Sequence, residues 1–261
     1  IAEGSKGLRS IQRKGSNSFE ALNEPIILDG PYSNSAFDIV CKNDKVYMII
    51  GGKDLLNGKR FDKGGYILTY DYDKWSFIDP KEAQKKLNLP RNPRDYTSIA
   101  VTTDDSNDEI VYASSMGDGV IQYKNGTPVQ SYNEKNAFKE TAGGYGSGYC
   151  YIDGLAFDKN GNLWMTSSEV NHAVLVLDKA GARHRLDIEQ LRGVYTINDI
   201  LITSTNDKWI YVPRNTPKLV MIPNSESLDE VSSYEFTTLI DTDGKELTPS
   251  NYTCVAEDKD G

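Results

Sequence analysis

A motif returns five times along this chain, and its central aliphatic residue recurs at intervals of 45 to 60 residues. A supersecondary unit that repeats with a period of this order indicates a propeller or a solenoid. The copies begin at Phe37, Tyr96, Tyr151, Tyr195 and Tyr252, and their central aliphatic residues are Ile39, Ile99, Leu155, Ile200 and Val255.

Every copy follows the same internal plan. A short apolar segment leads through a polar turn into a second apolar segment, and in the first four copies two more β-rich segments follow. The turns are made of Asn, Asp and Gly, which tolerate tight-turn backbone angles. The pattern therefore predicts an all-β propeller of four-stranded antiparallel blades. The later segments are 66–70 and 75–78, 120–123 and 129–132, 174–177 and 183–186, and 219–222 and 234–239.

Each end of the chain looks like part of a repeat. Residues 1–22 resemble the second, third and fourth strands of a blade, and residues 252–261 resemble a first strand and its turn. By this count about five blades are visible, with both termini cut inside a blade. Either the two partial blades join to complete one, or the chain is a fragment of a larger multidomain propeller protein. We expect residues 1–261 to form one propeller domain or a part of one.

Composition argues against several classes of function. The formal net charge of −9 disfavours a nucleic-acid partner, which would require a cationic surface. No segment approaches the roughly 20 apolar residues that a membrane-spanning helix needs, so we expect no transmembrane segment. The three cysteines are an odd number without metal-ligand spacing, and we expect buried free thiols at Cys41, Cys150 and Cys254.

Candidate reactive groups are sparse. The two histidines, His172 and His184, have no Ser or Cys nucleophile motif near them and are too few for a three-histidine zinc site. Asp-x-x-Gly segments beginning at Asp158, Asp241 and Asp258 resemble the start of a calcium loop but lack the downstream Glu of an EF-hand. We interpret them as hairpin turns. The sequence thus predicts a non-catalytic protein without a metal or cofactor.

Positive charge is concentrated in one stretch of the chain. Residues 53–94 hold ten Lys and Arg against six Asp and Glu, a surplus of +4 in an acidic protein. Part of it surrounds the best helix signal, which Asp79 caps, Pro80 opens and Pro90 ends. One interpretation is an anion-binding patch that suits a sugar phosphate, a uronic acid or an acidic protein face. The other is the solvated face of a surface helix.

A glycine-rich segment at residues 141–150 is the second candidate site. Glycine lets a backbone approach a ligand closely, and the two tyrosines offer aromatic faces with hydroxyl groups, as sugar and peptide sites require. A flexible connector is the alternative. Together the two features give six candidate residues for binding a ligand or partner: Lys53, Arg60, Arg91, Arg94, Tyr145 and Tyr149.

The third and fifth copies resemble a known repeat. Residues 151–167, YIDGLAFDKNGNLWMTS, and residues 252–261 are similar to the two-component regulator propeller family, in which Asp-x-x-Gly-Asn-aliphatic-Trp follows an aliphatic strand. The stretch from Gly161 to Trp164 matches this pattern fully. The other copies depart from it, because Tyr replaces Trp at Tyr47, Tyr112 and Tyr211. The resemblance implies a propeller.

A narrower resemblance covers residues 46–75 and 91–101, where a Gly-Gly pair, a basic insert and a strand ending at Trp75 are similar to PorZ-type propellers of the type IX secretion system in Bacteroidetes. It implies a non-catalytic component of the attachment complex, with envelope or secretion-complex proteins as partners and anionic lipopolysaccharide or oligosaccharide as a candidate ligand. A competing resemblance is to extracytoplasmic, oligosaccharide-sensing domains of hybrid two-component systems. Both imply the periplasm or the outer-membrane cell surface. An interaction propeller without a small ligand is a third possibility.

Overall fold

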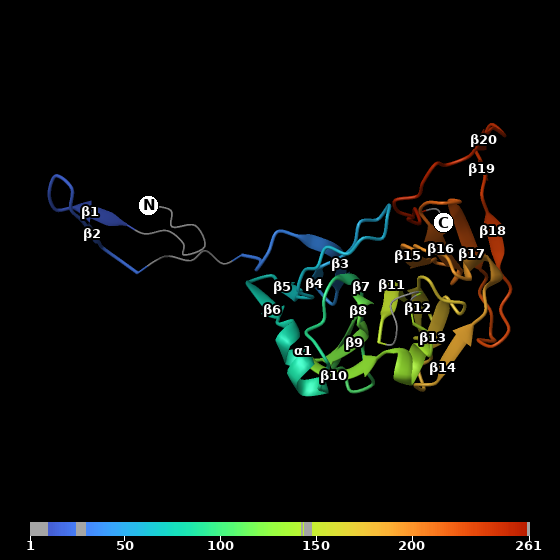
Figure 1. Ribbon diagram of the computed structural model, residues 1–261, viewed down its shortest axis with the longest axis horizontal. Helices are drawn as coiled ribbons and strands as arrows, with labels where there is room; N and C mark the ends of the chain where they lie inside the picture. Colours follow the sequence, from blue (N-terminus) through green and yellow to red (C-terminus); the bar gives the residue numbers. More distant parts are fainter. Residues whose placement is uncertain (1–9, 25–29, 142, 144–147, 260–261) are drawn as a thin grey trace.

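The computed structural model describes residues 10–24, 30–141, 143 and 148–259, and within them it shows an all-β chain with a single α-helix (Figure 1). The prediction of an all-β fold is confirmed. The first sheet contains β3 (Ala36–Lys42), β4 (Lys45–Ile50), β5 (Ile67–Asp71) and β6 (Lys74–Ile78), and the fourth contains β15 (Asp199–Ile202), β16 (Lys208–Val212), β17 (Lys218–Ile222) and β18 (Tyr234–Phe236).

The middle of the chain forms one larger, eight-stranded sheet. Its two halves, which we call the second and third sheets, are joined where Cys150 and Tyr151 pair with Gly117 and Met116. The second sheet contains β7 (Tyr96–Thr103), β8 (Glu109–Gly117), β9 (Gly119–Lys124) and β10 (Thr127–Tyr132), and the third contains β11 (Cys150–Phe157), β12 (Leu163–Ser167), β13 (Val174–Leu177) and β14 (Arg183–Leu186). All pairings inside the four sheets are antiparallel.

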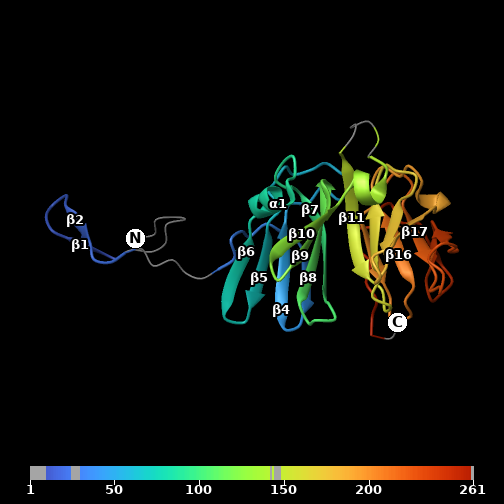
Figure 2. The same ribbon diagram turned by 90° about the horizontal axis from the view of Figure 1, so that it is seen from below.

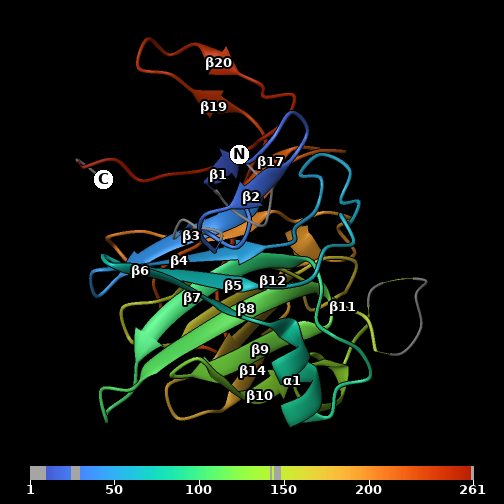
Figure 3. The ribbon, with the colours of Figure 1, turned by 90° about the vertical axis from the view of Figure 1, so that its left-hand side faces the viewer.

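The sheets stack face to face in sequence order, with an apolar core between each pair. Ile99 of β7 lies in a buried cluster with Tyr47, Ile49 and Ile67 of the first sheet, and Figure 3 shows these two sheets in adjacent layers. The same arrangement buries the third sheet against the second and the fourth against the third. Burial of these large aliphatic and aromatic side chains is the main force that holds the sheets together.

Polar contacts link the first strands of neighbouring sheets. The amide of Ile99 donates to Oδ2 of Asp38 on β3 over 3.1 Å, and the amide of Leu155 donates to Oγ of Ser98 on β7 over 3.2 Å. In both cases the acceptor is the residue just before the central aliphatic residue of the preceding copy. Otherwise unpaired backbone groups are thereby satisfied inside the core.

The third copy has a glycine at the acceptor position, and the contact changes there. A Cβ on Gly154 would lie 2.5 Å from Oδ1 of Asp199 and 2.7 Å from the amide of Ile200. That amide donates instead to the carboxylate of Asp199 in the same strand, over 2.8 Å. Burial, followed by repulsion from Asp38, raises the pKa of Asp199 to about 8.

The turn between β11 and β12 explains the motif in the third copy. Oδ1 of Asp158 accepts hydrogen bonds from the amides of Asn160 and Asn162, and Oδ2 accepts from Nδ2 of Asn162 and Nε1 of Trp164 at 2.9 Å each. Gly161 has a φ of 84°, in the left-handed region that this turn requires. The Asp158 segment is therefore a hairpin turn, as the sequence predicts.

The one α-helix, α1 (Pro80–Leu87), lies where the sequence predicts it. Oδ1 of Asp79 accepts the amide of Lys81 over 2.9 Å, and Asn88 ends the helix in the left-handed region. No helix in the described residues is long and apolar enough to span a membrane. Among the described residues, two short helical turns, η2 (Glu134–Phe138) and η3 (Glu189–Leu191), lie in the connections from β10 to β11 and from β14 to β15.

Of the two alternatives for the ends of the chain, joined partial blades are not seen within the described residues. The hairpin of β1 (Ile11–Arg13) and β2 (Phe19–Ala21) pairs only with itself among the described residues, and Figure 1 shows it far from the C-terminal segment. Residues 252–259 contain no strand. Another hairpin, β19 (Leu239–Ile240) with β20 (Glu246–Leu247), precedes them.

The expectation for the cysteines is only partly correct. Cys150 is buried at the start of β11, but Cys41 and Cys254 are exposed, and all three are free thiols. Cys41 lies on the face of the first sheet that no other described sheet covers. A position on the first strand of a repeat is therefore not enough to bury a side chain, because a neighbouring sheet must also cover it.

A histidine ties the fourth sheet's long connection to the third sheet. Nδ1 of His184 lies 2.8 Å from Oδ1 of Asp229, and Nε2 lies 3.2 Å from Oδ2 of Asp178. The hydrogen bond to Asp229, together with that to Asp178, raises the pKa of His184 above its ordinary value of 6.5.

We expect this contact to make stability pH-dependent. Because the folded pKa of His184 is raised, the contribution is complete below about pH 6.5 and is lost as pH rises through the folded value. Asp229 is largely exposed, so the effect should be on the order of 0.5 kcal/mol. Urea unfolding at pH 6 and pH 9 measures it, and His184→Gln should remove this part of the pH dependence. If the free energy of unfolding changes with pH equally in the wild type and in His184→Gln, the assignment to His184 is wrong.

Candidate functional site

The antiparallel order of each sheet gathers one set of connections at the same end of the molecule. The segments after every second and every fourth strand leave the sheets together, and they include α1 (Figure 2, upper end). We call this the α1 end. Arg60, Arg91, Arg94 and Tyr149 all lie in these connections, so residues separated by up to 89 positions in sequence share one surface.

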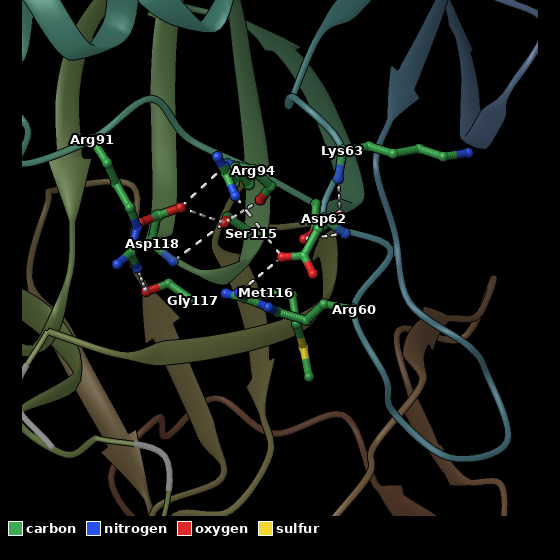
Figure 4. Close-up of polar contacts among 10 residues, drawn as sticks. Arg60, Asp62, Lys63, Arg91, Arg94, Ser115, Met116, Gly117 and Asp118 are labelled. Atoms are coloured by element: carbon green, nitrogen blue, oxygen red, sulfur yellow. Dashed lines mark hydrogen bonds and ion pairs between the residues drawn. The ribbon is translucent and has the colours of Figure 1, made fainter. Parts of the chain in front are cut away.

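Arg91 attaches the β6–β7 connection to the turn between β8 and β9. Its Nε donates to Oδ1 of Asp118 over 2.6 Å, and its Nη2 donates to the carbonyl of Gly117 over 3.3 Å (Figure 4). The guanidinium carbon also lies 4.7 Å from the ring centroid of Tyr149, a cation–π distance. Arg91 and Tyr149, both predicted from the sequence, are thus brought into direct contact.

Arg60 and Arg94 share a carboxylate. Nη2 of Arg60 donates to Oδ1 of Asp62 over 3.0 Å, and Nη1 of Arg94 lies 3.9 Å from the same oxygen (Figure 4). Nη1 of Arg60 also reaches the carbonyl of Met116, at 3.4 Å. The three predicted arginines therefore lie close together on one surface.

Carboxylates offset much of the charge of these arginines. Asp62 and Asp118 form the ion pairs, and the buried Asp95 accepts the amides of Asp62 and Lys63 at 3.1 and 2.9 Å. Oδ2 of Asp118 further accepts the amide of Arg94 over 3.2 Å. The arginines thus hold three connections together, and the surplus of +4 counted in the sequence does not become a bare cationic patch at this point.

Lys53 does not lie with the arginines. Its side chain is 1 % exposed, and its Nζ forms an ion pair with Asp153 of β11, which is fully buried. Nζ also donates to the carbonyl of Ile197, just before β15, over 2.5 Å. Ser168 completes the group by donating to Oδ2 of Asp153 over 2.6 Å. A ligand at the surface cannot reach this ammonium, so we leave Lys53 out of the candidate site.

The burial of Lys53 results from the path of residues 51–60, which we call the strap. Gly51 and Gly52 begin it with φ values of 136° and 93°, and a Cβ on Gly51 would lie 2.3 Å from the amide nitrogen of Tyr96. From there the strap leaves the first sheet and crosses to the fourth, where a Cβ on Gly58 would lie 2.8 Å from Oγ1 of Thr196. It spans the stack of sheets at the α1 end.

A pocket of about 450 Å³ opens beside the strap. Arg60 and Tyr149 line it, whereas Arg91 and Arg94 lie next to it, and Tyr145 is outside the described residues. Three aromatic rings and groups of both charges face the same space, a lining that suits a polar ligand with apolar faces. The lining residues are Asn57, Gly58, Lys59, Arg60, Asp62, Met116, Tyr149, Tyr151, Glu169 and Tyr195.

Sequence reasoning did not select Tyr151, Glu169 or Tyr195 as site residues. Tyr151 and Tyr195 do carry a signal, because each begins a copy of the repeat and therefore follows a connection at the α1 end. Glu169 carries no such sequence signal, since only the fold brings it to the pocket. Burial, with a smaller contribution from Asp153, raises the pKa of Glu169. In the described part of the chain, no group of three or more His, Cys, Asp or Glu has a metal-binding arrangement.

Comparison with known proteins identifies relatives by structure alone. No family model and no curated protein matches the sequence. PorZ of Porphyromonas gingivalis, described as an essential surface component of the type IX secretion system, aligns over 94% of this chain with a TM-score of 0.75 and 18% identity. The extracellular domain assigned to a hybrid two-component system of B. thetaiotaomicron aligns over 91% with a TM-score of 0.51 and 14% identity.

These matches confirm both resemblances at the level of the fold. The chain spans 33% of the PorZ structure and 30% of the two-component structure, so it corresponds to about a third of each. At such low identity the likeness concerns the path of the backbone and does not carry ligand or partner with it.

Proposed function

We propose that this chain is a non-catalytic binding module of the bacterial cell envelope, built as a β-propeller and acting as a PorZ-like component of type IX secretion and attachment. The TM-score of 0.75 to PorZ over nearly the whole chain is the observation that carries this proposal. The module would work in the periplasm or at the outer-membrane cell surface. The alternative, an extracytoplasmic sensor domain of a hybrid two-component system, has the weaker support of a TM-score of 0.51.

Packing supports the interpretation of the sheets as blades of a ring. The central aliphatic residue of each later copy is buried against the preceding sheet, with exposures of 2% for Ile99, 5% for Leu155 and 5% for Ile200. Ile39, the equivalent residue of the first sheet, is 56% exposed. We propose that another blade covers this face in the complete propeller, because a large exposed apolar surface on a sheet favours a packing partner.

We further propose that the partner or ligand binds at the α1 end, in the pocket beside the strap. Connections on a rigid scaffold are where binding residues concentrate, and this pocket combines three tyrosine rings with Arg60 and Glu169. Such a lining suits an oligosaccharide or lipopolysaccharide segment, since rings stack on sugar faces while charged groups bind hydroxyls and acidic substituents.

A calorimetric panel tests this function. The purified chain is titrated with lipopolysaccharide from P. gingivalis, with acidic hyaluronan oligosaccharides and with neutral maltooligosaccharides. Binding to lipopolysaccharide supports the secretion role, and preferential binding to short neutral glycans supports the sensor alternative. If an anionic ligand binds, its affinity should fall between about 0.01 and 1 M salt, where the Debye length shrinks from about 30 to 3 Å. No binding to any member of the panel would reject the ligand proposal.

Removing an aromatic ring from the pocket should weaken binding strongly. We expect Tyr149→Ala and Tyr195→Ala each to raise the dissociation constant about tenfold, equivalent to about 1.4 kcal/mol, because each loses a stacking surface. Tyr72→Ala is the matched control, since Tyr72 is an exposed tyrosine in the turn between β5 and β6, at the opposite end of the sheets. A comparable loss in the Tyr72 variant would place the site elsewhere.

A further inference from the structure

A second pocket, of about 320 Å³, includes Leu56 of the strap in its lining and shares Tyr195 with the pocket beside the strap, which we call the tyrosine-lined pocket. We propose that it binds a compact anionic group, namely a phosphate, sulfate or carboxylate. The proposal rests on the binding role inferred above, but apart from Tyr195 it concerns a different set of side chains. The pocket is lined by Leu56, Arg192, Gly193, Val194, Tyr195, Thr196, Val212, Arg214, Asn215, Thr216 and Lys218.

The charge of this lining is of one sign. Arg192, Arg214 and Lys218 face the pocket, and its lining contains no Asp or Glu. The tyrosine-lined pocket differs, because Asp62 and Glu169 are part of its wall. An anion entering the second pocket would meet three cationic side chains, and the carboxylates that pair with two of them, Asp187 and Glu235, are not part of the lining.

Ion pairs position two of the three cations. Arg192 donates through Nε and Nη2 to the two carboxylate oxygens of Asp187, at 2.6 and 2.5 Å, and Nζ of Lys218 lies 2.8 Å from Oε2 of Glu235. Arg214 has no ion-pair partner within the described part of the chain. Its charge acts on Asp54 of the strap, whose carboxylate already accepts the amides of Leu56 and Asn57. Arg214 is therefore the cation most available to a ligand.

A buried hydroxyl group in the pocket wall also lacks a partner. Thr196 is 6% exposed, and its Oγ1 makes no hydrogen bond although it is buried. Leaving such a group unsatisfied is costly, and Thr196 is one of the residues that line the pocket. The groups around Arg60 and Arg91 are carboxylates, which accept hydrogen bonds, whereas the hydroxyl of Thr196 is a hydrogen-bond donor.

The turn that presents Arg214 is held in an unusual conformation. Asn215 and Thr216 have φ values of 57° and 96°, both in the left-handed region. A β-branched residue there is a genuine outlier, and such outliers concentrate at binding sites. The turn between β16 and β17 is thus kept in a shape that directs its residues to the pocket wall.

Titration followed by amide chemical shifts tests the proposal on the intact chain. The probes are inorganic phosphate, sulfate and glucuronate, and the expected result is a saturable shift confined to the amides of Gly193, Val194, Asn215 and Thr216. Arg214→Gln should weaken this binding about tenfold, equivalent to about 1.4 kcal/mol. Arg185→Gln is the matched control, because Arg185 is an exposed arginine of β14 outside the pocket.

Two results would overturn the proposal: no saturable shift with any of the three anions, or equal affinity in the wild type and the Arg214→Gln protein. Comparing glucose 6-phosphate with inorganic phosphate identifies the source of the anion. Tighter binding of the sugar phosphate, lost in Tyr195→Ala, points to a glycan that spans both pockets, and equal binding points to a free anion. Tyr149→Ala should leave the phosphate-induced chemical shift changes unaltered. The proposal for the tyrosine-lined pocket and the proposal for the second pocket can therefore be rejected independently of each other.

Discussion

Replacing Lys53 by Met is expected to lower the free energy of unfolding by about 3–5 kcal/mol, because it leaves the buried carboxylate of Asp153 without its counter-charge. The carbonyl of Ile197 loses its donor in the same substitution. Methionine fills a similar volume, so the loss would measure the ionic contact rather than a cavity. Urea denaturation monitored by tryptophan fluorescence gives the value.

Two companion variants define the cause. Lys59→Met removes an exposed lysine from the same strap, and it should change the unfolding free energy by less than about 0.5 kcal/mol. Adding Asp153→Leu to Lys53→Met should recover part of the loss, since the unpaired charge is then gone. If Lys53→Met destabilises no more than Lys59→Met does, the buried ion pair does not hold the strap.

The second large effect is expected at Trp164, whose replacement by Ala should cost about 3–5 kcal/mol of unfolding free energy. The side chain is 1% exposed in the core between the third and fourth sheets. Its Nε1 donates to Asp158, and the Nζ of Lys208 lies 4.6 Å from its ring centroid. Truncation therefore leaves a cavity and also removes a donor from the β11–β12 turn.

Trp209→Ala provides the matched control, because Trp209 is half-buried at the outer face of the fourth sheet and contacts Phe236. We expect Trp209→Ala to lower the free energy of unfolding by less than half as much as Trp164→Ala does. Trp164→Phe should fall between the wild type and Trp164→Ala, since it restores most of the volume but not the hydrogen bond. Equal losses for both alanine variants would contradict the assigned burial.

Patterns among neighbouring residues in the sequence predicted the features that neighbouring residues determine, namely the repeated strands and α1. The recurrence of Ile99, Leu155 and Ile200 marked the first strands of successive sheets, because each lies at the same place in a repeated strand–turn–strand unit. The capping signals around Pro80 predicted α1 for a similar reason, since a helix end is decided by the few residues around it.

The candidate site was only partly predictable, because charge counts along the sequence do not show how side chains pair. Arg60, Arg91 and Arg94, which the positive stretch contains, lie close together on one surface in the structure. The carboxylate of Asp118, 27 residues after Arg91, offsets one of them, and this pairing exists only after the β8–β9 turn folds back. Lys53 is the extreme case, since its partner lies 100 residues away.

The strap also affects how cooperatively the protein should unfold. In a linear array of repeats each unit contacts only its neighbours, so unfolding can begin at one end and proceed unit by unit. Here the side chain of Lys53, in the strap that leaves the first sheet, is held by residues of β11 and of the segment before β15. Fraying of the first or the fourth sheet would disturb that contact, so the four sheets should melt in a single cooperative transition rather than in stages.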